Sequence, residues 1–146
     1  MRLALVLAAL LALGASGSAV AMTTLPGFRS PSHNIRCFRN AEAPRVIHCS
    51  IAQAAYAKRL TAYCASPPIG VDWGGFELGA TRKGAITCTG GVLYSPDTQR
   101  LNDTVLRYGK VWHSGPFTCW SRVAGVTCKS RSGHGLFVSR QSWRVW

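Results

Sequence analysis

The chain has 146 residues, with 17 Lys or Arg against 5 Asp or Glu, so its formal net charge at pH 7 is +12. Hydrophobic residues make up 47% of the chain, which excludes a polar disordered protein. A chain of this length has room for one domain, and it contains neither a G-x-G-x-x-G nor a P-loop motif. A large multidomain enzyme and a dinucleotide-binding βαβ fold are therefore excluded.

Residues 1–21 have the organisation of a secretory signal peptide. Two residues that end in Arg2 are followed by an apolar run over residues 3–13 and by an A-x-A cleavage pattern at residues 19–21. The apolar run is shorter than the roughly 20 residues that a permanent membrane span needs. We expect cleavage after Ala21 and release of residues 22–146 as one secreted domain with a net charge of +11, because Arg2 is the only charged residue of the leader. The alternative is an uncleaved anchor.

The pattern of the remaining chain predicts a mainly β fold, a small antiparallel sheet or barrel with one short helix, stapled by disulfides. Strands are expected, in chain order, over residues 34–38, 45–51, 76–78, 85–88, 104–108, 110–113, 116–121, 126–130, 136–139 and 143–146. The helix is expected over residues 52–63 and should end before the prolines at 67–68. Irregular structure is expected for the lead-in 22–27, the turns 72–75 and 81–84, and the segment 90–103.

Six cysteines follow the expected leader: Cys37, Cys49, Cys64, Cys88, Cys119 and Cys128. An even number of cysteines in an exported chain predicts three disulfides. The sequence has no C-x-x-C pair and no H-x(3–5)-H pair, so we expect no metal site, no redox-active pair and no cofactor.

Five of these cysteines share one local pattern, in which an apolar residue stands two positions before the cysteine and a polar residue lies between. Residues two apart point to the same face of a strand, so the pattern predicts half-buried strands whose cysteines face the core. A tight turn at residues 123–124 would place Cys119 opposite Cys128, unless a bulge at Gly125 shifts the register.

A turn-like segment at residues 40–44 separates Cys37 from Cys49 in the same way, which leaves Cys64 for Cys88. Six cysteines allow 15 pairings, and we predict 37–49, 64–88 and 119–128. Each would close a loop of roughly 10 to 25 residues and contribute about 3 kcal/mol in the chain-entropy picture. Residues 28–51 and 117–130 would both be strand–turn–strand units with a cysteine in each strand, so an internal duplication is an open interpretation.

Several short motifs are spread over nearly all of the chain after the leader, at residues 28–37, 72–74, 106–109, 117–119, 125–128 and 133–140. In these motifs the chain resembles an uncharacterised secreted or envelope domain family of unknown function that is widespread in actinobacteria. The resemblance implies export and the cysteine framework, and it brings no catalytic residue. The chain departs from the family pattern at His33, where the turn usually continues with Gly, and in the segment 91–103.

The basic residues suggest an anionic partner. Thirteen of the 17 are Arg, which suits planar contact with phosphate or carboxylate. Arg122 near Trp120, and Arg144 between Trp143 and Trp146, predict a basic aromatic surface. We expect a non-enzymatic binding module whose partner is an anionic cell-wall polymer, lipid head groups or an envelope protein, with nucleic acid less favoured. The alternative is that the tryptophans are core residues and the arginines only maintain solubility.

Residue types suited to a ligand site or to hydrolysis are also present. His134 lies between two glycines, and Ser139 and Arg140 follow it, while Asp72 and Trp73 lie in an expected turn. Convergence of His134, Arg140 and Trp73 on one pocket would favour a ligand site or an enzyme. Ser139, His134 and Asp72 could form a hydrolytic triad, although no G-x-S-x-G motif occurs.

A small secreted hydrolase of the ribonuclease kind is a second hypothesis. It would need an acid–base pair and a cation beside the phosphate, and His113, His134, Glu77 and Arg140 offer those residue types. A third hypothesis is a specific protein-binding or inhibitory module, in which the charge only steers association.

Overall fold

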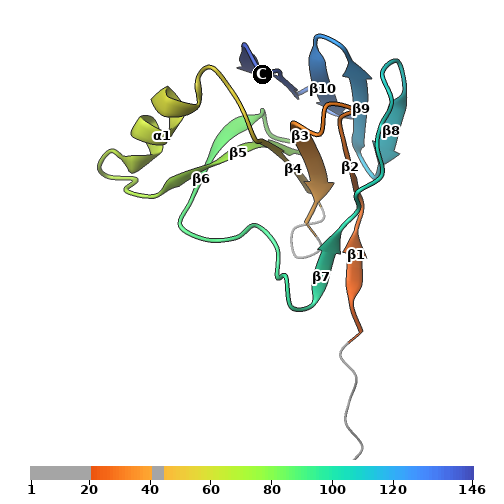
Figure 1. The fold of residues 1–146 in the computed structure, drawn as a ribbon, viewed down its shortest axis with the longest axis horizontal. Helices are drawn as coiled ribbons and strands as arrows, with labels where there is room; N and C mark the ends of the chain where they lie inside the picture. The colour runs from red at the N-terminus through yellow and green to blue at the C-terminus, as the bar shows by residue number, and fades with distance from the viewer. Residues whose placement is uncertain (1–20, 41–44) are drawn as a thin grey trace, which may run out of the picture.

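The computed structural model describes residues 21–40 and 45–146, so the expected leader lies outside the described residues except for Ala21. The first sheet has the strand order β2 (Gly27–Arg29), β3 (Ile35–Arg39), β4 (Val46–Ile51), β5 (Asp72–Gly79) and β6 (Ala85–Thr89). The second sheet has the order β8 (Val111–Ser114), β9 (Phe117–Arg122), β10 (Gly125–Ser130), β11 (Gly135–Val138) and β12 (Trp143–Val145). The helix α1 (Ala57–Ala65) joins β4 to β5, and β1 (Thr23–Leu25) pairs in parallel with β7 (Gln99–Leu101) (Figure 1).

Both sheets are antiparallel meanders in which strands consecutive in the chain are neighbours. Their inner faces share one hydrophobic cluster, to which the first sheet contributes Phe28 and Phe76 and the second contributes Phe117 and Leu136. Because an antiparallel sheet can bury one face and leave the other to solvent, the two meanders form a sandwich with two outer faces. The prediction of a mainly β fold with antiparallel strands and one short helix is confirmed.

All three predicted disulfides are confirmed. Cys37 and Cys49 lie directly opposite each other on β3 and β4, with a Cα–Cα distance of 4.1 Å, and Cys119 and Cys128 do the same on β9 and β10 at 4.0 Å. The third disulfide joins Cys64 of α1 to Cys88 of β6 and so ties the helix to the edge of the first sheet. The alternative of a bulge at Gly125 is not observed, because Gly125 pairs with Arg122 in the same register that places Cys128 opposite Cys119.

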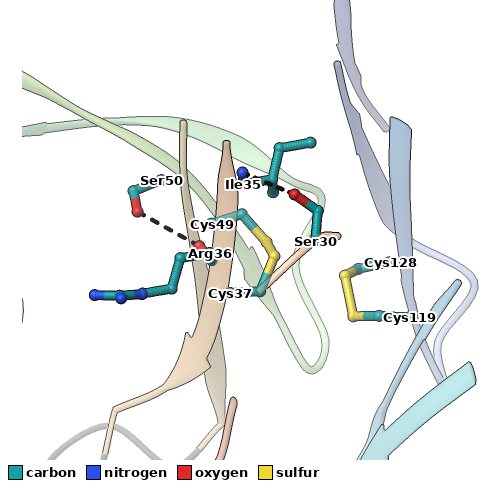
Figure 2. The surroundings of a disulfide bond; sticks show 8 residues. All are labelled: Ser30, Ile35, Arg36, Cys37, Cys49, Ser50, Cys119 and Cys128. Carbon is teal, nitrogen blue, oxygen red and sulfur yellow. Dashed lines mark hydrogen bonds between the residues drawn. A yellow bond between two sulfur atoms is a disulfide. The ribbon is translucent and has the colours of Figure 1, made fainter. Parts of the chain in front are cut away.

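The two cross-strand disulfides meet in the middle of the sandwich, and Figure 2 shows them facing each other across the space between the sheets. The sulfur atoms of Cys37, Cys49 and Cys128 all lie within 4.8 Å of one another, and these residues are 0–1% exposed. Sulfurs that are joined in disulfides are not thiolate ligands, so this sulfur cluster is a packing element of the core.

Two of the predicted irregular segments contain strands. The lead-in 22–27 holds β1, and the segment 90–103 holds β7, which pair with each other over three residues. The interacting residues are far apart in the chain, so no local pattern indicates the pairing. The expected turn at residues 72–75 belongs to β5, because its glycines form a bulge between Trp73 and Gly75 and do not end the strand.

Two other expectations are corrected. Residues 104–108 do not form a strand and make only an isolated bridge between Arg29 and Val105. The helix begins at Ala57 rather than residue 52. The N–H groups of Ala52 and Ala55 donate to the carbonyl oxygens of Asn34 and Arg140, so contacts with neighbouring segments, which local helix propensity does not reflect, set the path of the chain before the helix.

The outer face of the first sheet is partly covered. His48 and Thr87, which alternation places on the polar side of their strands, are both 7% exposed. The ring of Phe38 packs on His48 at 5.7 Å and on Tyr94 at 5.9 Å, between ring centroids. The segment that contains Tyr94 therefore lies over this face and leaves the second sheet with the more open outer face.

The disulfide in the second sheet should contribute more to stability than its short loop implies. Chain entropy alone gives about 2.7 kcal/mol for Cys119–Cys128 and about 3.5 kcal/mol for Cys64–Cys88. Removing the two fully buried sulfurs of Cys119–Cys128 also leaves a cavity, which adds about 2 kcal/mol, whereas only Cys64 of the Cys64–Cys88 pair is fully buried and its cavity cost is about half as large. In urea unfolding, we expect the Cys119→Ala/Cys128→Ala variant to lose more free energy of unfolding than the Cys64→Ala/Cys88→Ala variant. The reverse order would show that the sulfur cluster is not an important packing element.

His48 should make stability depend on pH. Burial lowers the pKa of His48 below 6.5, and the Glu77 carboxylate, 4.0 Å from its Nδ1, opposes this more weakly. Between the folded and unfolded pKa values the unfolded chain binds more protons, so the free energy of unfolding should fall as pH drops below 6.5. We expect urea unfolding at pH 7 and at about pH 5.5 to show this loss, and His48→Gln to reduce it. An unchanged pH profile in that variant would assign the effect to other groups.

Candidate functional site

The outer face of the second sheet gathers the aromatic and cationic residues of four strands. Strand register places Trp120 of β9, Thr127 of β10, Phe137 of β11 and Arg144 of β12 side by side across the sheet. Successive residues of a strand alternate between faces, and Cys119 and Cys128 point inward, so these four side chains point outward. We call the hollowed part of this surface the basic aromatic face; it is lined by Trp120, Arg122, Thr127, Lys129, Arg144 and Trp146.

Glycines shape this face. An added Cβ at Gly135 would collide with the ring of Trp146, so the absence of a side chain lets the indole lie on the neighbouring strand. The Trp146 Nε1–H donates to the carbonyl oxygen of Gly133 at 3.2 Å, and the Arg144 guanidinium carbon lies 4.7 Å from the centre of the Trp146 ring. The indole is thus held by a hydrogen bond and a cation–π contact, in a position set by the sequence Gly133–Gly135.

Within the part of the chain that the structure describes, acidic side chains do not balance the positive charge of this face. Arg122, Lys129 and Arg144 are exposed, and no Asp or Glu of the described residues lines the hollow. Among the described residues, Asp103 pairs with Arg36 at 2.6 Å and Glu77 faces His48, both away from this face. An anion that approaches the basic aromatic face therefore meets uncompensated cations beside half-buried indoles.

A second cavity lies where several turns meet, and we call it the end pocket. Its volume is about 370 Å³. It is lined by Ser30, Ser32, His33, Asn34, Ile35, Ala52, Gln53, Tyr108, Arg122, Val123, Ala124, Gly125, Val126, Ser139, Arg140 and Gln141. Arg122 lines both hollows, so the end pocket and the basic aromatic face are neighbouring parts of one surface.

The residues predicted for a ligand site are divided between different places. Trp120 and Arg122 lie on the basic aromatic face, and Arg140 and Ser139 lie at the end pocket. Trp73 instead packs on Tyr56 and Phe76 and donates its Nε1–H to the carbonyl oxygen of Gly75 at 2.9 Å.

Of the other predicted residues, Asp72 is exposed at the start of β5, and His134 lies half-buried in the turn before β11. The cavities found among the described residues do not bring His134, Arg140 and Trp73 together. The Ser139 hydroxyl is used within its own turn, where it donates to the carbonyl oxygen of Ser142 at 3.0 Å and accepts the Gln141 and Ser142 N–H groups. No hydrogen bond of the described residues joins it to His134 or Asp72, so the structure does not assemble that triad.

The ribonuclease set is also dispersed. His113 on β8 bonds through Nδ1 to the Thr118 hydroxyl at 3.0 Å, while Glu77 faces His48 in the first sheet. Arg140 is the only one of the four predicted residues that lines the end pocket. The sequence reasoning missed Asn34, Gln53 and Tyr108 as cavity residues, because the cavity forms from segments that are distant in the chain.

Comparison with known proteins identifies one family. A protein-family model described as "Family of unknown function (DUF6636)" matches residues 4–145. No curated protein and no solved structure matches the chain. Among the described residues, the single helix is too short to cross a membrane.

Tyr56 should hold the turn that carries Arg140. Its hydroxyl donates to the carbonyl oxygen of Ser139 at 2.9 Å, and burial raises the pKa of Tyr56 to about 12. Tyr56→Phe leaves that buried carbonyl with one partner fewer, so we expect a loss of about 1–2 kcal/mol in the free energy of unfolding. Tyr63→Phe, at a 53% exposed residue of α1, the helix that follows Tyr56, is the matched control and should change stability little. Equal effects of both variants in urea unfolding would contradict this role.

Proposed function

The chain belongs to DUF6636, a family of unknown function, and we propose that it is a secreted, disulfide-stabilised, non-enzymatic module that binds an anionic polymer of the cell envelope. Three disulfides indicate an extracytoplasmic location, where thiols are oxidised. The signal-peptide pattern of residues 1–21 supports export with cleavage after Ala21.

The observation that carries the proposal is the basic aromatic face. Its three cations can contact phosphate or carboxylate groups, while the indoles of Trp120 and Trp146 offer flat apolar surfaces between them. The usual spacing of neighbouring strands gives about 14 Å from the axis of β9 to the axis of β12. That width suits several repeat units of a polymer better than a single small ion.

The tryptophans divide into two groups, which bears on the alternative that they serve only the core. Trp73, Trp112 and Trp143 pack against the hydrophobic cluster of the sandwich, as that alternative expects. Trp120 and Trp146 instead line the hollow with the cations. Rings that are held among charged side chains on an outer face suggest a contact surface rather than additional core.

Dispersal of the predicted catalytic residues is what favours binding over hydrolysis in this proposal. The hydroxyl of Ser139 is engaged in its turn, and His113 lies on the open sheet face away from Arg140. The uncompensated cations, by contrast, gather on one surface. The proposed partner is an acidic wall polymer such as teichoic acid, and anionic vesicles and RNA are the comparators of the test.

Retention of residues 22–146 on immobilised teichoic acid should fall steeply with salt, because binding releases counterions. The Lys129→Gln/Arg144→Gln variant should lower the slope of log affinity against log salt by roughly 1 to 2, since two phosphate contacts are lost. Trp120→Ala should weaken retention by roughly 5-fold or more with the slope unchanged, because a stacking contact is lost.

The matched control is Lys58→Gln/Arg59→Gln on α1, which removes the same charge at exposed positions outside the basic aromatic face. It should leave the slope close to that of the natural sequence. An equal fall in the control would show that net charge alone drives retention. No retention at low salt, or tighter binding to RNA or to vesicles than to teichoic acid, would contradict the proposed partner.

A further inference from the structure

We propose that the end pocket is a separate binding site for a dianionic phosphate monoester, held between Arg122 and Arg140. Its volume of about 370 Å³ lies within the range of small-molecule sites. A cavity of this size has room for a phosphate group and an attached unit of about the size of a sugar. The inference does not depend on polymer binding, because most of the lining residues lie outside the basic aromatic face.

The wall that carries Arg140 is fixed in place before any ligand arrives. The guanidinium Nη2 of Arg140 donates to Oε1 of Gln53, which is a neutral partner. Gln53 is itself held by Asn34, whose Nδ2 donates to the Gln53 carbonyl oxygen at 3.0 Å and whose Oδ1 accepts the Gln53 N–H at 2.8 Å. The carbonyl oxygen of Arg140 also accepts the N–H of Ala55 at 2.8 Å. Such preorganisation lowers the entropy that is lost on binding.

The charges of the end pocket call for an anion. Arg122 and Arg140 line the same cavity, and neither forms an ion pair with a carboxylate among the described residues. Two cations that face one cavity repel each other, and an oxyanion between them removes that repulsion. Guanidinium groups match phosphate oxygens in bidentate geometry, and two of them favour a dianion over a monoanion.

His33 supplies a second, independent observation. Among the described residues it is the only one other than glycine with a positive φ, at 57°. Glycine adopts this conformation without cost, whereas a residue with a Cβ does not. His33 lines the same end pocket as the two arginines, so a residue with a side chain is kept there at a backbone position that favours glycine.

The rest of the lining suits the organic part of such a ligand. The exposed residues Val123 and Ala124 provide apolar surface, and Tyr108 lines the same cavity. An inorganic ion would leave these groups without contact. The structure therefore favours a monoester with an attached carbon unit over free phosphate.

Isothermal titration calorimetry with glucose 1-phosphate, dimethyl phosphate and inorganic phosphate tests the site. We expect glucose 1-phosphate to bind with the highest affinity and Arg140→Gln to weaken it by about tenfold. Arg59→Gln, an exposed charge on α1 outside the cavity, should leave the affinity unchanged. The proposal would be overturned if dimethyl phosphate or inorganic phosphate bound as tightly as glucose 1-phosphate, or if the two variants had equal effects.

His33→Gly separates a ligand role from a structural one. Glycine relieves the positive-φ conformation, so thermal stability should stay the same or rise, while the affinity for glucose 1-phosphate should fall by roughly threefold. An unchanged affinity would remove His33 from the site.

Two further arms keep this inference distinct from polymer binding. Lys129→Gln/Arg144→Gln should weaken teichoic acid binding and leave glucose 1-phosphate binding intact, so either proposal can fail without the other. Competition then identifies the source of the monoester. If glucose 1-phosphate displaces bound teichoic acid, the natural monoester is the end of a polymer. If the two bind independently, the natural monoester is a free small molecule.

Discussion

The contact between two cross-strand disulfides is the constraint on which the rest of the structure depends. Each joins the second and third strands of a five-stranded meander, and their sulfurs meet in the core. A one-residue slip of a strand exchanges its two faces, so a disulfide between directly opposite residues fixes which side chains point outward. With Cys119 and Cys128 inside, Trp120 and Thr127 must lie on the outer face. The register of the disulfide thus determines the position of the basic aromatic face.

Charge and stability are linked through the same feature. An excess of basic residues repels itself and weakens a compact state, and a sandwich built from short strands has a modest core to oppose this. Three disulfides restrict the unfolded chain, and two of them also fill the core. The protein can therefore keep cations that have no acidic partner among the described residues on one outer face and around the end pocket, which an uncrosslinked domain of this size would tolerate less well.

Much of the fold could be predicted from local patterns, whereas much of the site could not. Alternation around the cysteines indicated the strands and the pairing of Cys37 with Cys49, because that signal lies within a few residues. In the sequence, β1 comes before the strands of the first sheet and β7 comes after them, so no local pattern indicates that the two pair. The sequence also indicated that Arg144 lies near Trp146. It could not indicate that the Trp146 indole lies over Gly135, because Gly135 belongs to the neighbouring strand. One feature of the sequence does mark the end pocket, because His33 occupies a turn position where glycine is favoured.

The five indole N–H signals of one NMR spectrum test most directly whether the outer face of the second sheet is the contact surface. Teichoic acid added to the isotope-labelled protein should shift the signals of Trp120 and Trp146 in a saturable way. Those of Trp73, Trp112 and Trp143, which pack against the core, should stay in place and act as internal references. Shifts confined to the core-packed indoles, or equal shifts of all five, would contradict the account.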